Sequence, residues 1–528
     1  MKSNWIKYVF IIFIIGILVF SVYKFKKDEA DKKLDEVDTS KSQEEMEKEI
    51  KLGIAGIDTI NPILSKNKNV QNITKLIYEP LVNLSSDYKA EPCLAKEWAK
   101  QSGNSYLVKL REGVRWSDGQ SFTSEDVRFT IDRLKDSPTI YSENVQDVDS
   151  IDIIDDYTIK INLSKEIPFF EYNLTFPILS KENYEGEDFN NTTKNNKPIG
   201  TGKFKISEAE SSYIILEKNT SWWNKEKEIT LEKITINLYS SVGELYNSFK
   251  LGNLDLISTE NDNLTNYIGT IGYSSKEMKD RKHTFLALNT ANYFLSKEEV
   301  RKAISYSIDK SNITTTIFGG KYYTSSFPLD YGNWLCKEQD ASSGYNLEQA
   351  KQLLKDAGWS LKKGSWQKTE NYKTQKLALN LLVKASDASK VSVAENIRAQ
   401  LLNQGIIINI VQATDEQYNN MINNKSYDIA LCSLTLSPSP NLESFFGDGN
   451  LANYTTDEIK NIMNEVKNTT DENVLKEKYK RLNEIYKTNI PYISLYNSKY
   501  TVAYNSALVG DFSPNWFYQF YGIEEWYK

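Results

Sequence analysis

Three apolar segments separated by two helical patterns constrain the fold of this chain more than any other feature. The apolar segments cover residues 376–383, 406–411 and 427–434, and the helical patterns cover 387–405 and 415–424. Three strands connected by helices at this spacing are typical of a parallel sheet in an α/β protein. Ligands of such sheets bind beyond the carboxyl ends of the strands, which here is the loop after Leu434. Pro438 and Pro440 exclude a continuing strand in that loop.

Two further helices are predicted from the residues at their ends. In FTSEDVRFTIDRL, Thr123 is suited to cap the helix and Asp126 is its acidic partner three residues later. In NLEQAKQLLKDAGW, Asn346 is the expected N-cap and Gly358 the expected left-handed terminator. An alternating strand is expected at residues 106–110. From Glu49 onward the pattern is therefore a mixture of helices and strands, without a sequence repeat.

Composition bounds the number of domains and excludes one class of partner. Without its first 47 residues the chain keeps about 480, which is too many for one core and enough for two or three domains. A net charge of -7 argues against a nucleic-acid partner. Cys93, Cys336 and Cys432 are far apart and odd in number, so they predict neither a disulfide framework nor a cysteine-rich metal site.

The amino-terminal segment predicts a membrane anchor. Residues 8–23 are apolar and uncharged, and counting back to Trp5 gives about 19 residues, or roughly 28 Å of helix, enough to cross a bilayer. No Ala-x-Ala-like site or cysteine follows, so an uncleaved helix in residues 1–27 is expected, with a signal peptide as the alternative. Residues 28–47 are a charged tether. Lysines flank both ends of the helix and leave its orientation open.

The motifs of common enzymes are missing from the sequence. There is no Gly-x-Ser-x-Gly elbow, no His-Glu-x-x-His pair and no phosphate loop. His283 is the one histidine, and its place just before an apolar strand favours a surface or hinge residue over a catalytic base. We therefore expect neither catalysis nor a cofactor nor a bound metal.

An ordered set of segments resembles the bacterial extracellular solute-binding proteins of family 5, the oligopeptide, dipeptide and nickel receptors of ABC importers. The run from IYEPLVNL to FTIDRL, residues 77–134, is similar to the family signature. PIGTGKFKI, the block around Trp222 and Trp223, LYNSFKLGNLDLIS and NLEQAKQLLKDAGW are similar to later landmarks of the family, in the same order. The two tryptophans are expected to be core residues, and the match covers essentially everything after the tether.

The resemblance implies a two-lobed α/β receptor of the periplasmic-binding-protein type, in its large class with an inserted subdomain. Lobe one is expected at 48–85, 198–283 and 499–528, the subdomain at 86–197 and lobe two at 284–498. His283, Tyr496 and Asn497 would form the hinge. The protein would be a monomer, held by its helix outside the cell, and would work with a permease and its ATPase subunits.

Ligand-contacting residues follow from the same resemblance. Family members hold a peptide's amino terminus with an Asp in a DYxxP-like loop, but here Leu436 stands at the acid's place and Ser437 at the aromatic's, and no acid lies between Asp428 and Glu443. Arg301 and Arg398 are expected to be structural rather than carboxylate clamps. The expected cleft residues are Lys66, Asn67, Lys68, Tyr141, Trp334, Ser433, Thr435, Leu436 and Ser437. For the 66–68 loop the alternative is a solvated loop, and for Trp334 it is ordinary packing.

These observations predict a receptor that binds peptides between two lobes. Because the acid at position 436 is missing, a blocked, cyclic or long peptide held by backbone pairing stays possible. Two alternatives remain open. One is a receptor for another small solute such as a nickel chelate, and the other is an interaction or signalling paralogue that no longer imports.

Overall fold

The computed structural model describes residues 47–528, except for 102–103, 137, 260–271, 330–331 and 337–343. The predicted anchor and the tether up to residue 46 lie outside the described residues. Within the described part, every helix is too short or too polar to span a bilayer.

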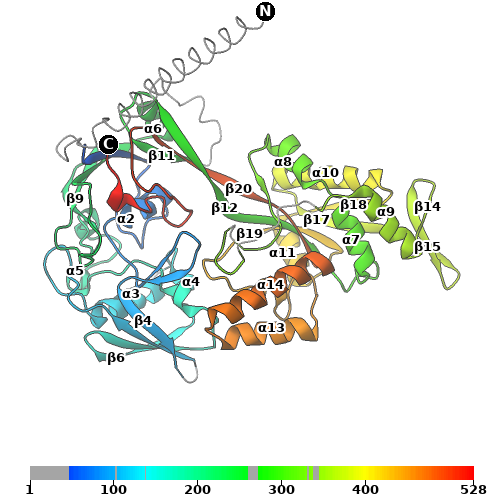
Figure 1. Cartoon of the computed structure of the whole chain (residues 1–528), viewed down its shortest axis with the longest axis horizontal. Helices are drawn as coiled ribbons and strands as arrows, with labels where there is room; N and C mark the ends of the chain where they lie inside the picture. Colours follow the sequence, from blue (N-terminus) through cyan, green and yellow to red (C-terminus); the bar gives the residue numbers. More distant parts are fainter. Residues whose placement is uncertain (1–46, 102–103, 137, 260–271, 330–331, 337–343) are drawn as a thin grey trace, which may run out of the picture.

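Two lobes are joined by a ribbon of two long strands, β12 (Tyr273–Leu288) and β20 (Tyr492–Asn505) (Figure 1). The strands pair antiparallel from Tyr273 opposite Asn505 to Ala287 opposite Tyr492, with register irregularities between Lys279 and His283 and between Thr284 and Phe285. One end of the ribbon belongs to the sheet of lobe one and the other end to the sheet of lobe two. A single mixed sheet therefore runs through both lobes.

Lobe one is built on the half of the sheet that lies beyond the ribbon. Its strands follow β20 in the order β11 (Leu256–Thr259), β1 (Glu49–Ala55), β10 (Lys233–Tyr239), β9 (Tyr213–Lys218) and β8 (Phe204–Ala209). Its helices are α2 (Lys68–Thr74) and α6 (Val242–Lys250), with the turn η5 (Ile523–Glu525) near the carboxyl end. Alternate residues of β10, such as Ile234 and Ile236, are fully buried, as expected for strands with one packed face.

The subdomain of lobe one has its own antiparallel sheet. The strand order is β4 (Ala95–Lys100), β5 (Ser105–Leu110), β7 (Thr158–Leu163) and β6 (Val148–Asp155). Its other elements are β2 (Val82–Leu84), β3 (Ala90–Pro92), α3 (Ser124–Asp136), α4 (Ser142–Val145), η2 (Phe170–Leu174), α5 (Lys181–Tyr184) and η3 (Thr193–Asn196). The expected acidic cap of α3 is present, because the Thr123 amide donates to Asp126 Oδ2 over 2.9 Å. The predicted strand and helix are thereby confirmed.

Lobe two contains the parallel strands predicted from the sequence. β17 (Ala378–Lys384) runs parallel to both β18 (Ile407–Ala413) and β19 (Ile429–Thr435), while β12 pairs antiparallel with β19. The crossover helices are α10 (Ala388–Asn403) and α11 (Asp415–Asn423). α9 (Leu347–Asp356) begins at its Asn346 cap, and Gly358 after it has φ +82°, as predicted. The three parallel strands are confirmed, within a sheet that is mixed as a whole.

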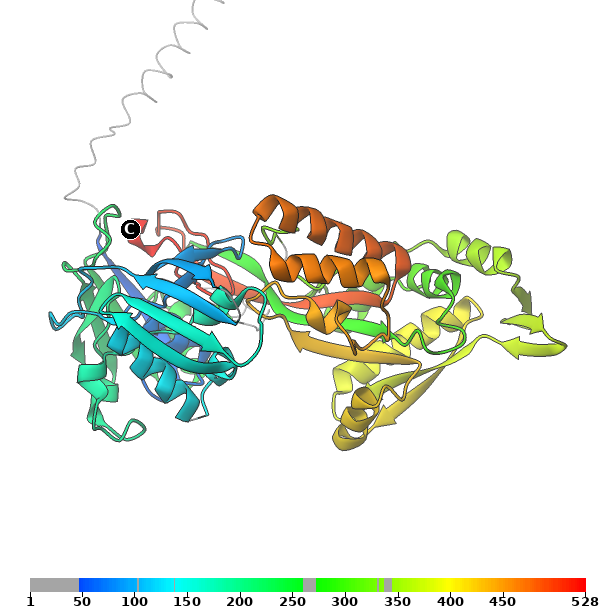
Figure 2. The same ribbon diagram turned by 90° about the horizontal axis from the view of Figure 1, so that it is seen from below.

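Helices cover both faces of this second sheet (Figure 2). Leu286 and Leu288 of β12 face one core, and the alternate residues Phe285 and Ala287 face the other. The remaining elements are α7 (Glu298–Tyr306), α8 (Lys310–Phe318), β13 (Tyr323–Thr324), β14 (Ser360–Lys362), β15 (Ser365–Glu370), β16 (Lys373–Lys376), α12 (Glu443–Phe446), α13 (Asp457–Asn468) and α14 (Glu472–Asn489). α7 to α10 contribute to the first core and α12 to α14 to the second.

Candidate functional site

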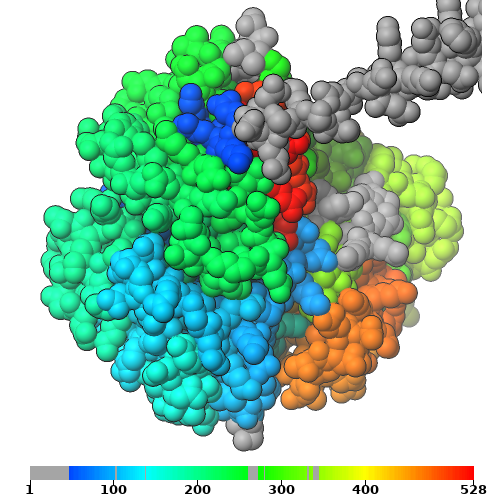
Figure 3. All heavy atoms as spheres, turned by 60° about the vertical axis from the view of Figure 1, so that its left-hand side comes forward, coloured from blue at the N-terminus to red at the C-terminus, as the bar shows by residue number. Residues whose placement is uncertain are grey.

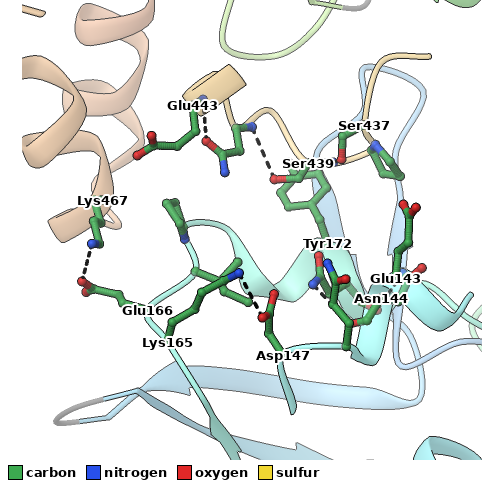
Figure 4. Close-up of a pocket in the computed structure, with 16 residues that line it drawn as sticks. Glu143, Asn144, Asp147, Lys165, Glu166, Tyr172, Ser437, Ser439, Glu443 and Lys467 are labelled. Carbon is green, nitrogen blue, oxygen red and sulfur yellow. Dashed lines mark hydrogen bonds and ion pairs between the residues drawn. The ribbon is translucent and has the colours of Figure 1, made fainter. Parts of the chain in front are cut away.

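A cavity of about 510 Å³ lies between the subdomain of lobe one and the loop that follows β19 in lobe two (Figure 4). The subdomain lines it with α4, with the connection from β7 to η2, and with η2 itself. Lobe two lines it with residues 437–443 and the end of α13. This loop lies beyond the carboxyl end of a parallel strand, where the sequence predicts the ligand, so we call this space the 437–443 cavity. Its polar lining residues include Glu143, Asn144, Asn173, Ser437, Asn441, Glu443 and Lys467.

The charges of the 437–443 cavity do not balance among the described residues. Lys165 pairs with Asp147 over 3.0 Å, and Lys467 of lobe two pairs with Glu166 of the subdomain over 2.9 Å. Hydrogen bonds from Lys100 and Lys467 hold the pKa of Glu166 below its usual value. Glu143 and Glu443 also line the cavity, and neither forms an ion pair within the described part of the chain. Two glutamates without an ion-pair partner in the described residues therefore line the cavity, one from each lobe.

A second interlobe cavity, of about 430 Å³, lies where the subdomain meets α13 and α14. Its walls include Trp98, Tyr106, Phe169 and Glu171 from the subdomain, and Trp334 from lobe two. We call it the Glu171 cavity. Pro168, Tyr172 and Lys467 line both cavities, so the two are adjacent. In Figure 3 the subdomain, in blue and cyan, meets the orange helices along this seam.

The segment 168–172 contacts lobe two directly. The Tyr172 hydroxyl accepts a hydrogen bond from Trp334 Nε1 (3.0 Å) and donates to the Tyr88 carbonyl (3.1 Å). The Phe169 ring packs against the buried core of lobe two and meets Tyr479 edge to face, with ring centres 6.3 Å apart. Phe169 has φ +58°, a left-handed conformation that costs energy for a residue with a side chain. Contact with lobe two stabilises this conformation.

The ribbon is irregular where it passes between the lobes. The sequence predicted a surface or hinge position for His283, but its ring is fully buried, so a surface position is wrong. Its Nδ1 lies 3.1 Å from Asn497 Oδ1 on the paired strand, and its Nε2 lies 3.2 Å from Ser494 Oγ. The rings of Phe285 and Phe445 pack against it, and burial lowers its pKa to about 4. Tyr496 is also buried, against Phe318 and Tyr322.

The loop before α2 contributes less to a cleft than the resemblance implies. Asn67 caps α2 by accepting the Asn69 amide over 2.9 Å, and its own side-chain amide donates to the carbonyls of Ala55 and Gly56. Lys66 is exposed, and its backbone amide donates to Asp58. Lys68 lies over the rings of Tyr500 and Trp516, 4.3 and 4.4 Å from their centres. These contacts fix the local fold of lobe one.

Three of the other expected cleft residues lie outside the interlobe cavities. Tyr141 lines a separate cavity of about 170 Å³ inside lobe one, between the subdomain and the carboxyl-terminal segment. Leu436 is 5% exposed, so its side chain belongs to the packed interior. The Ser433 hydroxyl is 2.8 Å from that of Thr284 on β12.

Three expected residues are accessible or reach the interlobe region. Thr435 is exposed, opposite Lys282 in the ladder. Ser437 lines the 437–443 cavity, and Trp334 lines the Glu171 cavity. Arg301 is structural as expected, because it donates to the carbonyls of Asn489 and Leu295 inside lobe two.

Arg281, which no sequence motif indicated, is a buried residue at the irregular step of the ribbon. Its guanidinium donates to the Ser437 carbonyl and lies 4.4 Å from the centre of the Phe517 ring. It thereby ties the ligand-side loop of lobe two to the carboxyl-terminal segment of lobe one. Glu143 and Glu171 were missed as well, because a single acid among 71 carries no pattern of its own. Within the described residues, no cluster of His, Cys, Asp and Glu could hold a metal ion.

Two lobes joined by a pair of strands, with cavities lined from both sides, define a two-lobed solute-binding protein. The chain belongs to the family described as bacterial extracellular solute-binding proteins, family 5, whose middle-region model matches residues 89–453. Proteins of this family are the solute-binding components of ABC importers. The resemblance stated from sequence motifs is thereby confirmed.

Relatives of this chain are named for different solutes. The oligopeptide-binding protein AppA of Bacillus subtilis is 24% identical, over 90% of this chain and 91% of its own. The nickel-binding periplasmic protein of Escherichia coli is 24% identical, over 67% of this chain and 69% of its own. The solved structure of a nickel ABC transporter protein from Bacillus halodurans shares the fold with a TM-score of 0.74 at 21% identity, covering 90% of this chain and 98% of that one.

Proposed function

We propose that this protein is a membrane-anchored, extracellular substrate-binding protein that takes peptides between its lobes and delivers them to an ABC permease with its ATPase subunits. The observation that carries the proposal is the pair of adjacent interlobe cavities, about 510 and 430 Å³, each lined by both lobes. Each is within the usual size range of a small-molecule site, and together they accommodate an extended chain. We take the protein to act as a monomer, without catalysis and without a cofactor.

A peptide is the ligand that best fits the lining of these cavities. Glu143 and Glu443 offer charge partners for an amino terminus, although position 436 holds a buried leucine. A desolvated ammonium needs such a partner. The name of the Bacillus subtilis relative, an oligopeptide-binding protein, supports the same reading. The ligand-contacting roles proposed for Ser437, Thr435 and Trp334 rest on their position at or beside this space.

Closure would occur at the irregular step of the ribbon. Between Lys279 and His283 the ladder loses its register, so this is where backbone dihedrals change most easily. His283, Tyr496 and Asn497 lie at this step and are proposed as the hinge. The apolar run at residues 8–23 supports an anchor that keeps the receptor beside its permease.

Thermal melts of the full chain in lipid nanodiscs test the proposal. Pooled peptides with free or acetylated amino termini are added, and copurifying molecules are identified by mass spectrometry. A ligand that binds only the folded state stabilises it by RT ln(1 + [L]/Kd), which is about 2.7 kcal/mol at a hundredfold excess over Kd. We expect a shift with peptides, and a larger one for those with a free amino terminus.

Other outcomes lead to other functions. Equal shifts of the melting temperature for free and acetylated peptides would show that Glu143 and Glu443 do not bind the amino terminus. A shift with a nickel chelate or haem, but with no peptide, would favour the second candidate, a receptor for another small solute. The names of the nickel-binding and heme-binding relatives support that candidate. The absence of any shift and of any copurified molecule would favour an interaction or signalling paralogue.

A further inference from the structure

The Glu171 cavity contains a carboxyl group without a counter-charge. Glu171 lies in the first turn of η2 and lines the cavity beside Tyr106 and Trp98. In the described part of the chain its side chain takes part in no hydrogen bond or ion pair with another side chain, while its own backbone amide faces it. Burial raises the pKa of Glu171 to about 7, the direction expected for a carboxyl without a cationic partner.

The lysines around the cavity are paired with other carboxylates. Lys89 pairs with Glu472 over 2.6 Å, and both Lys100 and Lys467 pair with Glu166. None of the three lowers the pKa of Glu171, whereas the Glu171 charge contributes to the raised pKa of Tyr106. The charged and titratable groups that face Glu171 from the surrounding elements are Lys89, Lys100, Tyr106, Tyr172, Lys467, Glu166 and Glu472.

Aromatic rings form much of the remaining wall. Trp98, Tyr106 and Phe169 come from the subdomain, and Trp334 closes the cavity from lobe two. The Trp334 ring already attracts two cations, since Lys89 Nζ lies 5.7 Å and Lys476 Nζ 5.8 Å from its centre. Aromatic faces favour an ammonium or guanidinium, and a carboxylate in the same low-dielectric space adds to that preference.

We propose that the Glu171 cavity receives a cationic group of the ligand, an alkylammonium or guanidinium such as the side chain of a lysine or arginine in a bound peptide. This inference rests on the proposed solute-binding function and narrows its ligand to molecules that carry a positive charge. Glu171 forms the ion pair with this cation. Trp334 of lobe two contributes the aromatic ring that packs against it.

Peptide titrations with a matched pair of variants test the inference. The probes are pentapeptides Ala-Ala-X-Ala-Ala in which X is lysine, arginine, norleucine or glutamate, titrated into the full chain in nanodiscs at pH 8. The wild type is expected to bind the lysine and arginine peptides at least tenfold more tightly than the norleucine peptide. Glu171→Gln should reduce that preference below threefold.

The control is Glu112→Gln, the same substitution at an exposed position of the same subdomain, which should keep the full preference. A second readout is the pH dependence. Because a bound cation must displace the proton of Glu171, the wild-type preference should fall about tenfold between pH 8 and pH 6 for a group with a pKa of about 7. Equal binding of all four peptides, or a preference that survives in Glu171→Gln, would overturn the inference but leave the peptide receptor intact.

n-Hexylammonium separates the two proposals if no peptide binds. A rise in the melting temperature of the wild type with n-hexylammonium, absent in Glu171→Gln, would support the cation site even though the peptide function had failed. If neither the peptides nor n-hexylammonium binds at millimolar concentration, the cation site is wrong as well.

Discussion

His283 is a buried titratable residue of the ribbon. Its ring is fully buried, and its two nitrogens face Asn497, Ser325 and Ser494 at 3.1 to 3.2 Å. Burial lowers its pKa from 6.5 to about 4, so the ring is neutral at physiological pH. In the unfolded chain the same ring binds a proton below about pH 6.5.

The stability of the protein should therefore fall as pH drops from about 6.5 towards 4. In this window the unfolded state binds the proton and the folded state does not, which costs up to about 3 kcal/mol. His283→Gln, which cannot titrate, should lose this part of the pH dependence, while the carboxylates act equally in both proteins. Denaturant unfolding of the two proteins at pH 7, 6, 5 and 4 gives the difference. Parallel stability curves would contradict the prediction.

Glu171 should change the stability with pH in the opposite direction to His283. Its pKa is raised from 4.5 to about 7 in the folded state, so the folded state holds the proton longer and stability falls as pH rises from about 4.5 to 7. Ligand-free Glu171→Gln should consequently be more stable than the wild type at pH 8, by about 2 kcal/mol, and nearly equal to it at pH 4. The same unfolding series measures both differences. If Glu171→Gln were less stable than the wild type at pH 8, the carboxylate of Glu171 would have a cationic or hydrogen-bonding partner in solution.

At the scale of elements, the turn from Pro168 to Tyr172 couples the lobes. Phe169 packs its ring on the core of lobe two, and Tyr172 accepts the hydrogen bond from Trp334. The left-handed backbone of Phe169 is compensated by this contact. Lobe separation would expose the ring and leave the strain uncompensated.

Phe169→Ala should loosen the lobes without unfolding either of them. Loss of this partly buried ring should cost about 1–3 kcal/mol of interlobe stabilisation. Small-angle X-ray scattering is then expected to show a larger radius of gyration for the ligand-free variant. Tyr372→Ala, at a fully exposed aromatic in the β15–β16 hairpin, is the control and should leave the radius unchanged. An unchanged radius in Phe169→Ala would show that other contacts hold the lobes together.

Elements with local signals could be predicted from the sequence. The strands β17, β18 and β19 and their crossover helices follow from hydrophobic period and length, and α9 follows from Asn346 and Gly358. The 16-residue strand β12 was not foreseen as one element, because its pairing with β20 joins residues more than 200 positions apart. Local periodicity carries no information on such a partner.

The candidate site was predicted only in part, for related reasons. The loop after β19 was located because parallel strands place ligands at that edge, and Ser437 does line a cavity there. Glu143 and Glu171 face ligand-sized spaces only because the subdomain is packed against lobe two. Asn67 shows the reverse, since a residue expected at the cleft is used to cap α2. Motif position fixes the neighbourhood of a residue but not the direction of its side chain.

At the scale of the whole molecule, lobe two is one continuous stretch of chain whose ends meet. His283 and Asn497 are neighbours on paired strands, so residues 284–498 leave and re-enter the ribbon at the same place. Their two cores are formed almost entirely within this stretch.

The fragment 284–498 should therefore fold alone. Calorimetry should show one cooperative transition with an unfolding enthalpy on the order of 150 kcal/mol for a domain of this size. The fragment lacks Phe169. The surface formed by α13 and α14 should therefore be less stable in the fragment than in the full chain. A broad transition with strong binding of a hydrophobic dye would contradict independent folding.

The ladder between β12 and β20 also limits how the receptor can move. Two strands bonded to each other along their length cannot slide independently without breaking those bonds, and the register is irregular only over the short region from Lys279 to Phe285. We therefore expect the lobes to bend and twist within this short region, while translation of one lobe past the other should be suppressed. Binding and release of a solute then depend on the same bending motion of the ribbon. A substitution in this region should therefore change the association rate and the dissociation rate together.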